Sequence, residues 1–172
     1  MGVKVKLKDG RIVLIREFRI EDKESLIEMY ESLSDEAVHW GMPPYSRERI
    51  ERRLDNIQNL IALVAIYNGK IVGDAHIFKF PQSRRKGTCD LAIYLHQDFH
   101  NVGLGTAMLT ELIELAKKEK LHRISLSVVA DSKLAVHLYQ KLGFKIEGVM
   151  KDAYFGEDGK YHDEIVMGLI LG

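Results

Sequence analysis

Two closely spaced glycines precede a long amphipathic segment in the second half of the chain. They belong to the run His100-Asn101-Val102-Gly103-Leu104-Gly105-Thr106, which follows a predicted strand and opens a predicted helix. Glycine lets a backbone approach a ligand closely, and the first N–H groups of a helix have no acceptor within that helix. The start of a helix also carries partial positive charge, so this loop suits an anion such as a diphosphate. A plain strand-to-helix turn without a ligand explains the same two glycines.

Two common nucleotide-binding patterns fit this segment less well. The dinucleotide fingerprint requires a third small residue where Met108 stands, and it opens a βαβ unit early in a domain. The Walker loop requires Gly-Lys followed by Ser or Thr after four intervening residues, which the segment lacks. A nucleotide-binding module is therefore the third-ranked hypothesis.

Hydrophobic periodicity and turn residues predict the elements that position this loop. Alternating apolar residues predict an opening hairpin around Asp9-Gly10, and Asn68-Gly69 predicts a second hairpin. Predicted strands span residues 3–7, 12–15, 60–67, 71–80, 88–95, 124–129, 144–154 and 161–171, and predicted helices span 22–33, 46–59, 103–119 and 132–142. With the opening hairpin counted as one strand, this order indicates a mixed α/β fold of α+β character, with about four helices and a central, mostly antiparallel sheet of about seven strands.

The composition excludes several classes of protein. With 172 residues, 46% of them hydrophobic, the chain predicts one globular domain over residues 1–172. Lysine and arginine together number 25, as do aspartate and glutamate, so no global field attracts nucleic acid. The apolar run 60–67 is too short to cross a bilayer, and the N-terminus lacks the apolar stretch of a signal peptide. The single Cys89, which we expect to be a buried core residue, excludes an internal disulfide, and we expect a cytoplasmic protein with no nucleic-acid or membrane partner.

Bulky aromatic residues lie in the segment VHWGMPPY between the first two predicted helices. Gly41, Pro43 and Pro44 prevent a continuous helix there. Trp40 and Tyr45 either line a substrate pocket or fill the core between the two helices, and the sequence favours neither alternative.

Two motifs together resemble the GCN5-related N-acetyltransferase family. The family's phosphate loop resembles Q/R-x-x-G-x-G/A, which His100, Gly103 and Gly105 match. Its second motif resembles N-x-x-A-x-x-L-Y-x-x-x-G-F, which residues 132–144 match. Both ends of the chain resemble the branches that acetylate ribosomal proteins and small amines.

The resemblance implies a splayed sheet and acetyl-CoA as the acetyl donor, with no metal. Ile93, Tyr94 and Leu95 would pair with the pantetheine arm through free backbone groups, and one amide would polarise the thioester carbonyl. His100 stands where Gln or Arg is usual and Ser132 where Asn is usual, which alters two side-chain hydrogen bonds but no backbone contact. The cofactor-binding residues would be Ile93, Tyr94, Leu95, Asn101, Val102, Gly103, Leu104, Gly105, Thr106 and Ser132.

Two residues take catalytic roles by the same resemblance. Tyr139, at the family's tyrosine position, would donate a proton to the leaving thiolate, although its place on the buried stripe of a helix also fits a core residue. Asp90, at the start of a predicted strand, would help remove the proton of the amine. A solvated charge at the end of a strand explains Asp90 equally well.

The resemblance also places the acceptor amine. Trp40, Tyr45 and Tyr154 would belong to loops that flank the acceptor channel. The acidic residues 157, 158, 163 and 164 would suit a cationic amine, or they simply form an exposed charged hairpin. The implied activity is transfer of acetyl from acetyl-CoA to a primary amine: a peptide N-terminus, a polyamine or another small amine. The alternative is a noncatalytic acyl-CoA-binding regulatory module, and a homodimer is one option for the oligomeric state.

Overall fold

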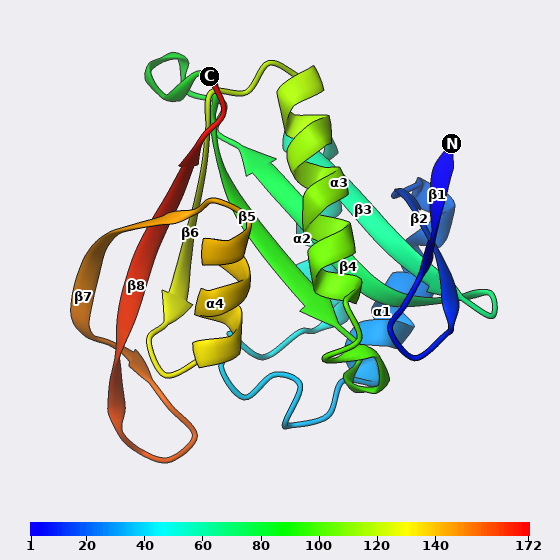
Figure 1. Cartoon of the computed structure of the whole chain (residues 1–172), viewed down its shortest axis with the longest axis horizontal. Helices are drawn as coiled ribbons and strands as arrows, with labels where there is room; N and C mark the ends of the chain where they lie inside the picture. The colour runs from blue at the N-terminus through cyan, green and yellow to red at the C-terminus, as the bar shows by residue number, and fades with distance from the viewer.

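A single sheet of eight strands runs through the computed structural model, which describes residues 1–172 (Figure 1). The strands follow the order β1-β2-β3-β4-β5-β6-β8-β7, and every neighbouring pair is antiparallel except β5 and β6. The strands are β1 (Gly2–Lys6), β2 (Ile12–Glu17), β3 (Leu60–Tyr67), β4 (Lys70–Lys79), β5 (Thr88–Leu95), β6 (Arg123–Val129), β7 (Lys145–Phe155) and β8 (Tyr161–Ile170). The helices are α1 (Lys23–Glu31), α2 (Arg47–Leu54), α3 (Leu104–Lys118) and α4 (Lys133–Lys141).

The sheet has one strand more than the predicted count of about seven. Both arms of the opening hairpin, β1 and β2, join the sheet, because β2 pairs with β1 on one side and with β3 on the other. The mixed, mostly antiparallel architecture with four helices is confirmed.

Most helices and strands begin and end within one or two residues of the predicted positions, because local side-chain interactions determine those ends. Ser46 caps α2, and its side chain accepts a hydrogen bond from the Arg49 N–H at 3.3 Å. The helix ends at Leu54, five residues before the predicted end, and a separate 3₁₀ turn covers Ile57–Asn59. Asp22 precedes α1 but makes no cap bond, because its carboxylate binds the Arg16 guanidinium at 2.7 and 2.8 Å instead.

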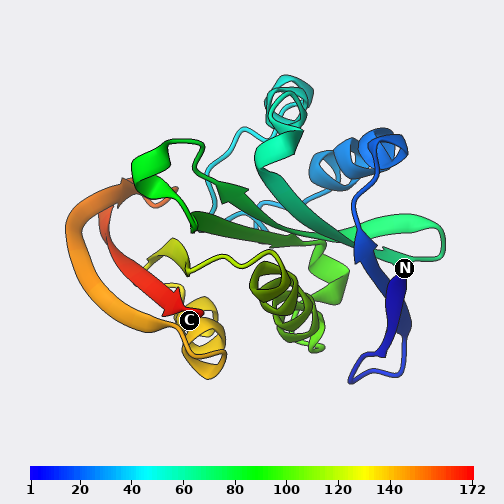
Figure 2. The same cartoon turned by 90° about the horizontal axis from the view of Figure 1, so that it is seen from above.

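The helices lie in two layers on opposite faces of the sheet (Figure 2). Helices α1 and α2 cover one face, where they enclose a small apolar cluster around Leu26, Ile27 and Val64. Helices α3 and α4 cover the other face over a larger core that includes Met108, Leu112 and the buried Cys89. Burial raises the pKa of the Cys89 thiol to about 12, as expected for an inert core cysteine. None of the helices has the length and apolar character needed to span a membrane.

Candidate active site

Strands β5 and β6 diverge after a short parallel contact. The register pairs residues 88–90 of β5 with residues 123–125 of β6, and no pair joins the strands beyond that point. On its other side β5 pairs with β4 along its length, and the His96 N–H donates to the Val72 carbonyl at 2.9 Å. Because successive backbone groups point to opposite sides, those of Leu91, Ile93 and Leu95 face the open gap. One arm of this V-shaped gap therefore offers free backbone groups to an extended ligand.

Two of the predicted cofactor-binding residues have other partners at this edge. The Leu95 carbonyl accepts a hydrogen bond from His100 Nε2 at 2.9 Å, which ties the glycine loop to the end of β5. Tyr94 lies out of phase with Ile93, so its N–H faces β4. Its ring packs 4.9 Å from that of Tyr45, on the face covered by α1 and α2. Tyr94 thus belongs to the opposite face of the sheet, while Ile93 keeps both backbone groups free.

The loop before α3 presents a row of unpartnered N–H groups. The backbone N–H groups of residues 101–106 donate no hydrogen bond within the protein. Asn101 and Gly103 both have positive φ, +59° and +91°, and such left-handed residues turn successive N–H groups to one side. The positive end of α3 begins at the next residue, Leu104. Free N–H groups turned to one side at the start of a helix form a cradle whose geometry suits an anion.

Segments far apart in the sequence converge on this cradle. A Cβ atom at Gly105 would lie 3.3 Å from Leu138 Cδ2 of α4 and 3.6 Å from Leu95 Cδ1 of β5. Glycine therefore allows α3, α4 and β5 to approach closely at the mouth of the gap. Ser132 is the N-cap residue of α4, and its side chain makes no capping hydrogen bond. Its hydroxyl is free for another partner.

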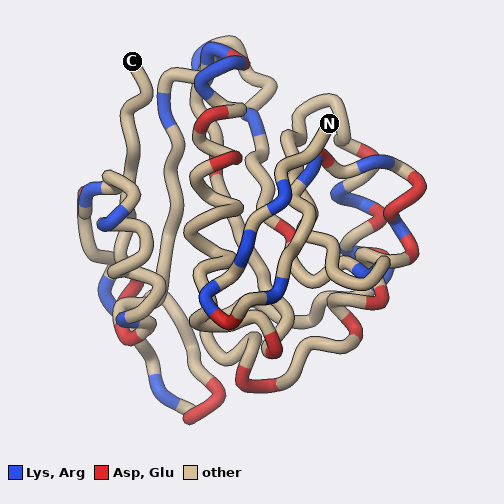
Figure 3. Tube along the Cα trace, turned by 45° about the vertical axis from the view of Figure 1, so that its right-hand side comes forward, with Lys and Arg blue, Asp and Glu red and all other residues tan.

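Lys8 lies beside the glycine loop, although the sequence did not predict it as part of the site. The Lys8 N–H donates to the Val102 carbonyl at 3.0 Å, and a Cβ at Gly103 would lie 3.7 Å from Lys8 Cε. Basic residues lie along the opening hairpin (Figure 3). In the sequence, lysines that alternate with apolar residues indicate only the solvent-exposed face of a strand. The sequence pattern could not predict this contact, because Lys8 and the glycine loop are more than 90 residues apart in the chain.

Tyr139 of α4 points its side chain into the core under the helix. Tyr139 is 8% exposed, and the centroid of its ring lies 5.7 Å from the centroid of the Phe144 ring. Burial raises the pKa of its phenol to about 12, so the hydroxyl keeps its proton throughout the neutral range. No group of the protein hydrogen-bonds that hydroxyl. The residue therefore combines a core ring with an uncommitted proton donor.

Asp90 lies at the point of the V, where it is the last residue of β5 paired with β6. Its side chain is exposed and makes no hydrogen bond or ion pair, on the face opposite the buried Cys89 and Leu91. Burial raises the pKa of this carboxyl, and the positive charges of Arg85 and Arg123 oppose the rise. A free carboxylate thus lies beside the vertex of the gap.

The loop between α1 and α2 rests on the β7–β8 hairpin. The buried Tyr154 donates from its hydroxyl to the Gly41 carbonyl at 2.7 Å, and the His39 carbonyl oxygen lies 3.2 Å from the same hydroxyl oxygen. Trp40 packs 5.0 Å from the His162 ring of the hairpin. Tyr45 instead packs on the small core, 5.5 Å from Tyr30, which favours the core-filling alternative for that residue.

A cavity of about 400 Å³ opens where this loop meets the hairpin. Tyr154 is the one predicted acceptor-side aromatic residue that lines it, and Trp40 and Tyr45 do not. Its lining residues are Val38, Gly41, Met42, Pro43, Ala153, Tyr154, Phe155, Gly156 and Glu157.

Three of the four acidic residues of the hairpin, Glu157, Asp158 and Asp163, have histidine or lysine partners within the chain. Glu157 lies 3.2 Å from His39 Nδ1, and Lys151 binds Asp163 at 2.8 Å. His162 contacts both Asp131 and Asp158, which raises its pKa. These pairs favour a structural role for the hairpin carboxylates over an acidic mouth for cationic amines.

A buried charged network, which sequence reasoning missed, lies on the same face as Tyr94. Asp74 of β4 is 0% exposed and accepts hydrogen bonds from Tyr30 at 2.5 Å and from Arg53 Nη1 at 2.7 Å. Burial alone would raise the pKa of Asp74, but the Arg53 guanidinium outweighs it and holds that pKa far below its usual range. His76 adjoins both, with its Nδ1 atom 3.1 Å from Arg53 Nη1.

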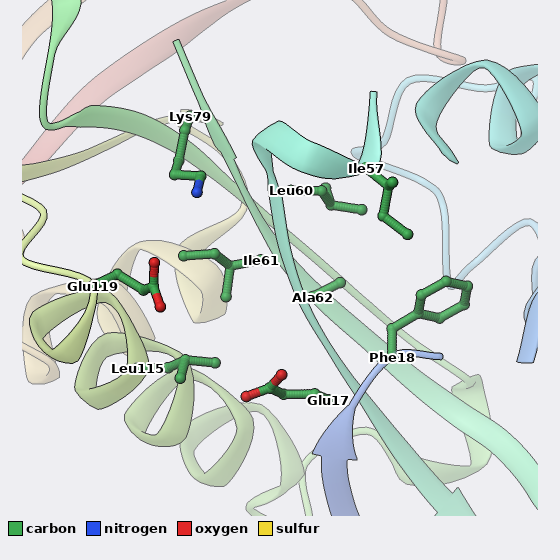
Figure 4. Close-up of a pocket in the computed structure, with 9 residues that line it drawn as sticks. All are labelled: Glu17, Phe18, Ile57, Leu60, Ile61, Ala62, Lys79, Leu115 and Glu119. Carbon is green, nitrogen blue, oxygen red and sulfur yellow. The ribbon is translucent and has the colours of Figure 1, made fainter. Parts of the chain in front are cut away.

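A second cavity, of about 210 Å³, lies away from these residues (Figure 4). Leu115 and Glu119 at the C-terminal end of α3 line it, together with Glu17, Lys79 and several apolar residues, most of them from the start of β3. The glycine loop opens the other end of the 15-residue α3, about 20 Å away. This cavity therefore plays no part in the site at the V.

Comparison of this chain with known protein families and structures identifies the class of protein to which it belongs. A sequence model of the acetyltransferase (GNAT) family matches residues 26–144. The chain belongs to the acetyltransferase (GNAT) family and is an N-acetyltransferase enzyme.

Individual relatives match nearly the whole chain. A solved acetyltransferase of the GNAT family from Streptococcus pneumoniae is 31% identical, with a TM-score of 0.81 over 92% of this chain and 99% of that one. The ribosomal-protein-alanine N-acetyltransferase from Brucella melitensis is 26% identical, with a TM-score of 0.78 and the same coverage. In sequence, the L-amino acid N-acetyltransferase AaaT of Escherichia coli K12 is 28% identical over 159 residues, which cover 92% of this chain and 98% of that protein.

Proposed function

We propose that this protein transfers an acetyl group from acetyl-CoA to a primary amine by direct attack of the amine, as one cytoplasmic catalytic domain over residues 1–172. The observation that carries the proposal is the row of free N–H groups at residues 101–106 beside the unpaired edge of β5. The acceptor is an amino acid, a peptide N-terminus or another small amine. The names of relatives that acetylate L-amino acids and ribosomal-protein alanine support α-amines among these acceptors.

The donor is held by backbone groups along two connected segments. The N–H groups of residues 101–106 bind the pyrophosphate, helped by the positive end of α3 and by Lys8. The free backbone groups of Ile93 pair with the pantetheine arm in the V. The Ser132 hydroxyl supplies a side-chain contact at the start of α4. Because most of these contacts are main-chain ones, the unusual His100 and Ser132 leave donor binding intact.

The acyl transfer needs only orientation, an oxyanion donor and two proton transfers. The amine nitrogen forms a bond to the acetyl carbonyl carbon, and the carbon–sulfur bond then breaks. Asp90 orders water that removes the amine proton, and a free N–H of β5 stabilises the oxyanion. The Tyr139 hydroxyl gives its proton to the departing thiolate. No step calls for a metal ion.

Gly103→Asp is expected to abolish the rise in melting temperature that acetyl-CoA gives the wild-type protein. The substitution puts a negative charge into the cradle and strains a residue whose φ is +91°. At 100 times its dissociation constant, a ligand of the native state stabilises it by about 2.7 kcal/mol. Thermal unfolding with and without acetyl-CoA measures the difference.

Gly69→Asp is the matched control for this variant. Gly69 also has positive φ, +75°, but lies in the β3–β4 turn with nothing near its Cβ position. Both variants carry similar backbone strain, and only the control should keep the acetyl-CoA shift. Equal shifts in the two variants would remove the loop from the binding site.

Asp90→Asn is expected to cost less than about tenfold in rate on an α-amine and much more on an alkyl amine. The α-amine of a peptide N-terminus, with a pKa of about 8, is neutral to roughly a tenth at pH 7, whereas an alkyl amine near 10.4 is neutral to less than about 0.1%. The alkyl amine therefore depends more on proton removal at the site. Rates against pH for both acceptors test this, with the exposed Asp55→Asn as control. A loss of about a thousandfold on both acceptors would make Asp90 a direct base, and no loss on either would place the base elsewhere.

A further inference from the structure

His76 of β4 lies next to the proposed site of attack. The β4–β5 register pairs His76 with Ala92 and Phe78 with Asp90, so all four side chains share one face of the sheet. Directly paired Cβ atoms lie about 5 Å apart and diagonal ones about 7–8 Å apart. Ala92 contributes only a methyl group between the larger side chains of His76 and Asp90. Small ligand groups above Ala92 are therefore within reach of both residues.

The hydrogen bonds of His76 fix which ring nitrogen carries its proton. Arg53 Nη1 lies 3.1 Å from His76 Nδ1, and a guanidinium can only donate. With Nδ1 accepting from Arg53, Nε2 is the ring nitrogen that carries hydrogen and can donate. Nδ1 also lies 3.3 Å from Asp74 Oδ2, but Asp74 already accepts shorter hydrogen bonds from Tyr30 and Arg53.

The Nε2–H group of His76 has no partner in the protein. It lies on the ring edge away from Arg53 and Asp74, and the side chain is 14% exposed. Arg53 cannot turn away to release the ring, because it is held by the fully buried Asp74. The network thus holds one N–H donor in a fixed orientation on the face of the sheet that also carries Asp90.

We propose that His76 is a specificity-determining residue that donates from Nε2 to the carbonyl or carboxylate oxygen of an α-amino acceptor. The inference rests on the proposed function and narrows its substrate class to α-amino carbonyl compounds. In these compounds an oxygen lies on the carbon next to the one that bears the amine, so one molecule can span Asp90 and His76. Alkyl amines and polyamines carry no such oxygen.

The test compares three acceptors that share one side chain. They are the α-amino acid that the wild-type enzyme acetylates fastest, its amide and the amine that lacks the carboxyl group; for leucine these are leucine, leucinamide and 3-methylbutylamine. His76→Phe removes the donor and keeps a ring, whereas His76→Gln restores an N–H donor near the position of Nε2. His122→Phe is the control, since His122 is exposed and the hydrogen bond of its ring is to the C-terminal Gly172 carbonyl, away from β4.

We expect His76→Phe to raise KM for the amino acid and its amide by about 10- to 100-fold, with a smaller change in kcat. The kcat/KM for the alkyl amine should stay within about twofold, and His76→Gln should recover part of the loss. A larger loss for the amino acid than for the amide would indicate a carboxylate as the preferred partner, and equal losses would indicate a carbonyl oxygen.

Similar losses on all three acceptors, or none, would overturn the inference while leaving the acetyltransferase proposal in place. A wild-type enzyme that acetylates no amine would overturn both. Thermal unfolding of each variant with acetyl-CoA shows whether fold and donor site are intact.

Discussion

Replacing Tyr139 by phenylalanine is expected to lower turnover by about 10²- to 10⁴-fold, the usual contribution of a positioned general acid. The KM for acetyl-CoA and the melting temperature should change little, because the Tyr139 hydroxyl has no hydrogen-bond partner and the ring stays in place. Steady-state rates at saturating acetyl-CoA and amine measure this effect.

The control for this variant is Tyr67→Phe. Tyr67 of β3 also has an unbonded hydroxyl and packs its ring 5.4 Å from Phe99, but β4 separates its strand from the V-shaped gap at β5 in the sheet order. Only Tyr139→Phe should lose turnover. Wild-type turnover in Tyr139→Phe would make Tyr139 a core residue alone.

Replacing Arg53 by methionine is expected to destabilise the fold by about 3–5 kcal/mol. The change leaves the carboxylate of Asp74, which is 0% exposed, buried without its counter-ion. Urea unfolding measures the free energy of unfolding, and Arg52→Met on the exposed side of α2 should cost less than about 0.5 kcal/mol.

The double variant Arg53→Met with Asp74→Asn separates a lost charge pair from lost packing. It should recover much of the stability, because no unpaired charge is then buried. A cost below about 1 kcal/mol for Arg53→Met alone would mean that water reaches Asp74. The depressed pKa of Asp74 gives the sign of the pH effect: its contribution to stability is present above the pKa of an unfolded aspartate and is lost only as pH falls towards the folded value.

Sequence reasoning located the elements because their signals are local. Strand β5 spans the predicted residues 88–95, and α3 lies within one residue of its prediction at each end. The β3–β4 turn follows from Asn68 and Gly69, which take φ of +49° and +75°. Helix α2 ends earlier than predicted because the chain turns at residues 57–59 to enter β3. Hydrophobic periodicity does not reveal such a turn.

The residues that escaped prediction have partners far away in sequence. Asp74 is the single carboxylate of β4, and its counter-ion Arg53 lies on a helix 21 residues earlier. Tyr94 lies beside Ile93 in sequence, but strand alternation sends its side chain to the opposite face. Spacing along one element cannot place such pairs, because the sheet register brings β4 and β5 together and helix packing brings α2 onto them.

The release of free thiol from acetyl-CoA, measured with and without a panel of amino acids, N-terminal peptides and alkyl amines, tests the central claim most directly. The predicted result is release that depends on amine, at a turnover on the order of 1 s⁻¹ or faster for the best α-amine, with loss of activity in Gly103→Asp. The contradicting result is an acetyl-CoA-dependent rise in melting temperature with no amine that stimulates thiol release, which would make the chain a noncatalytic acyl-CoA-binding module.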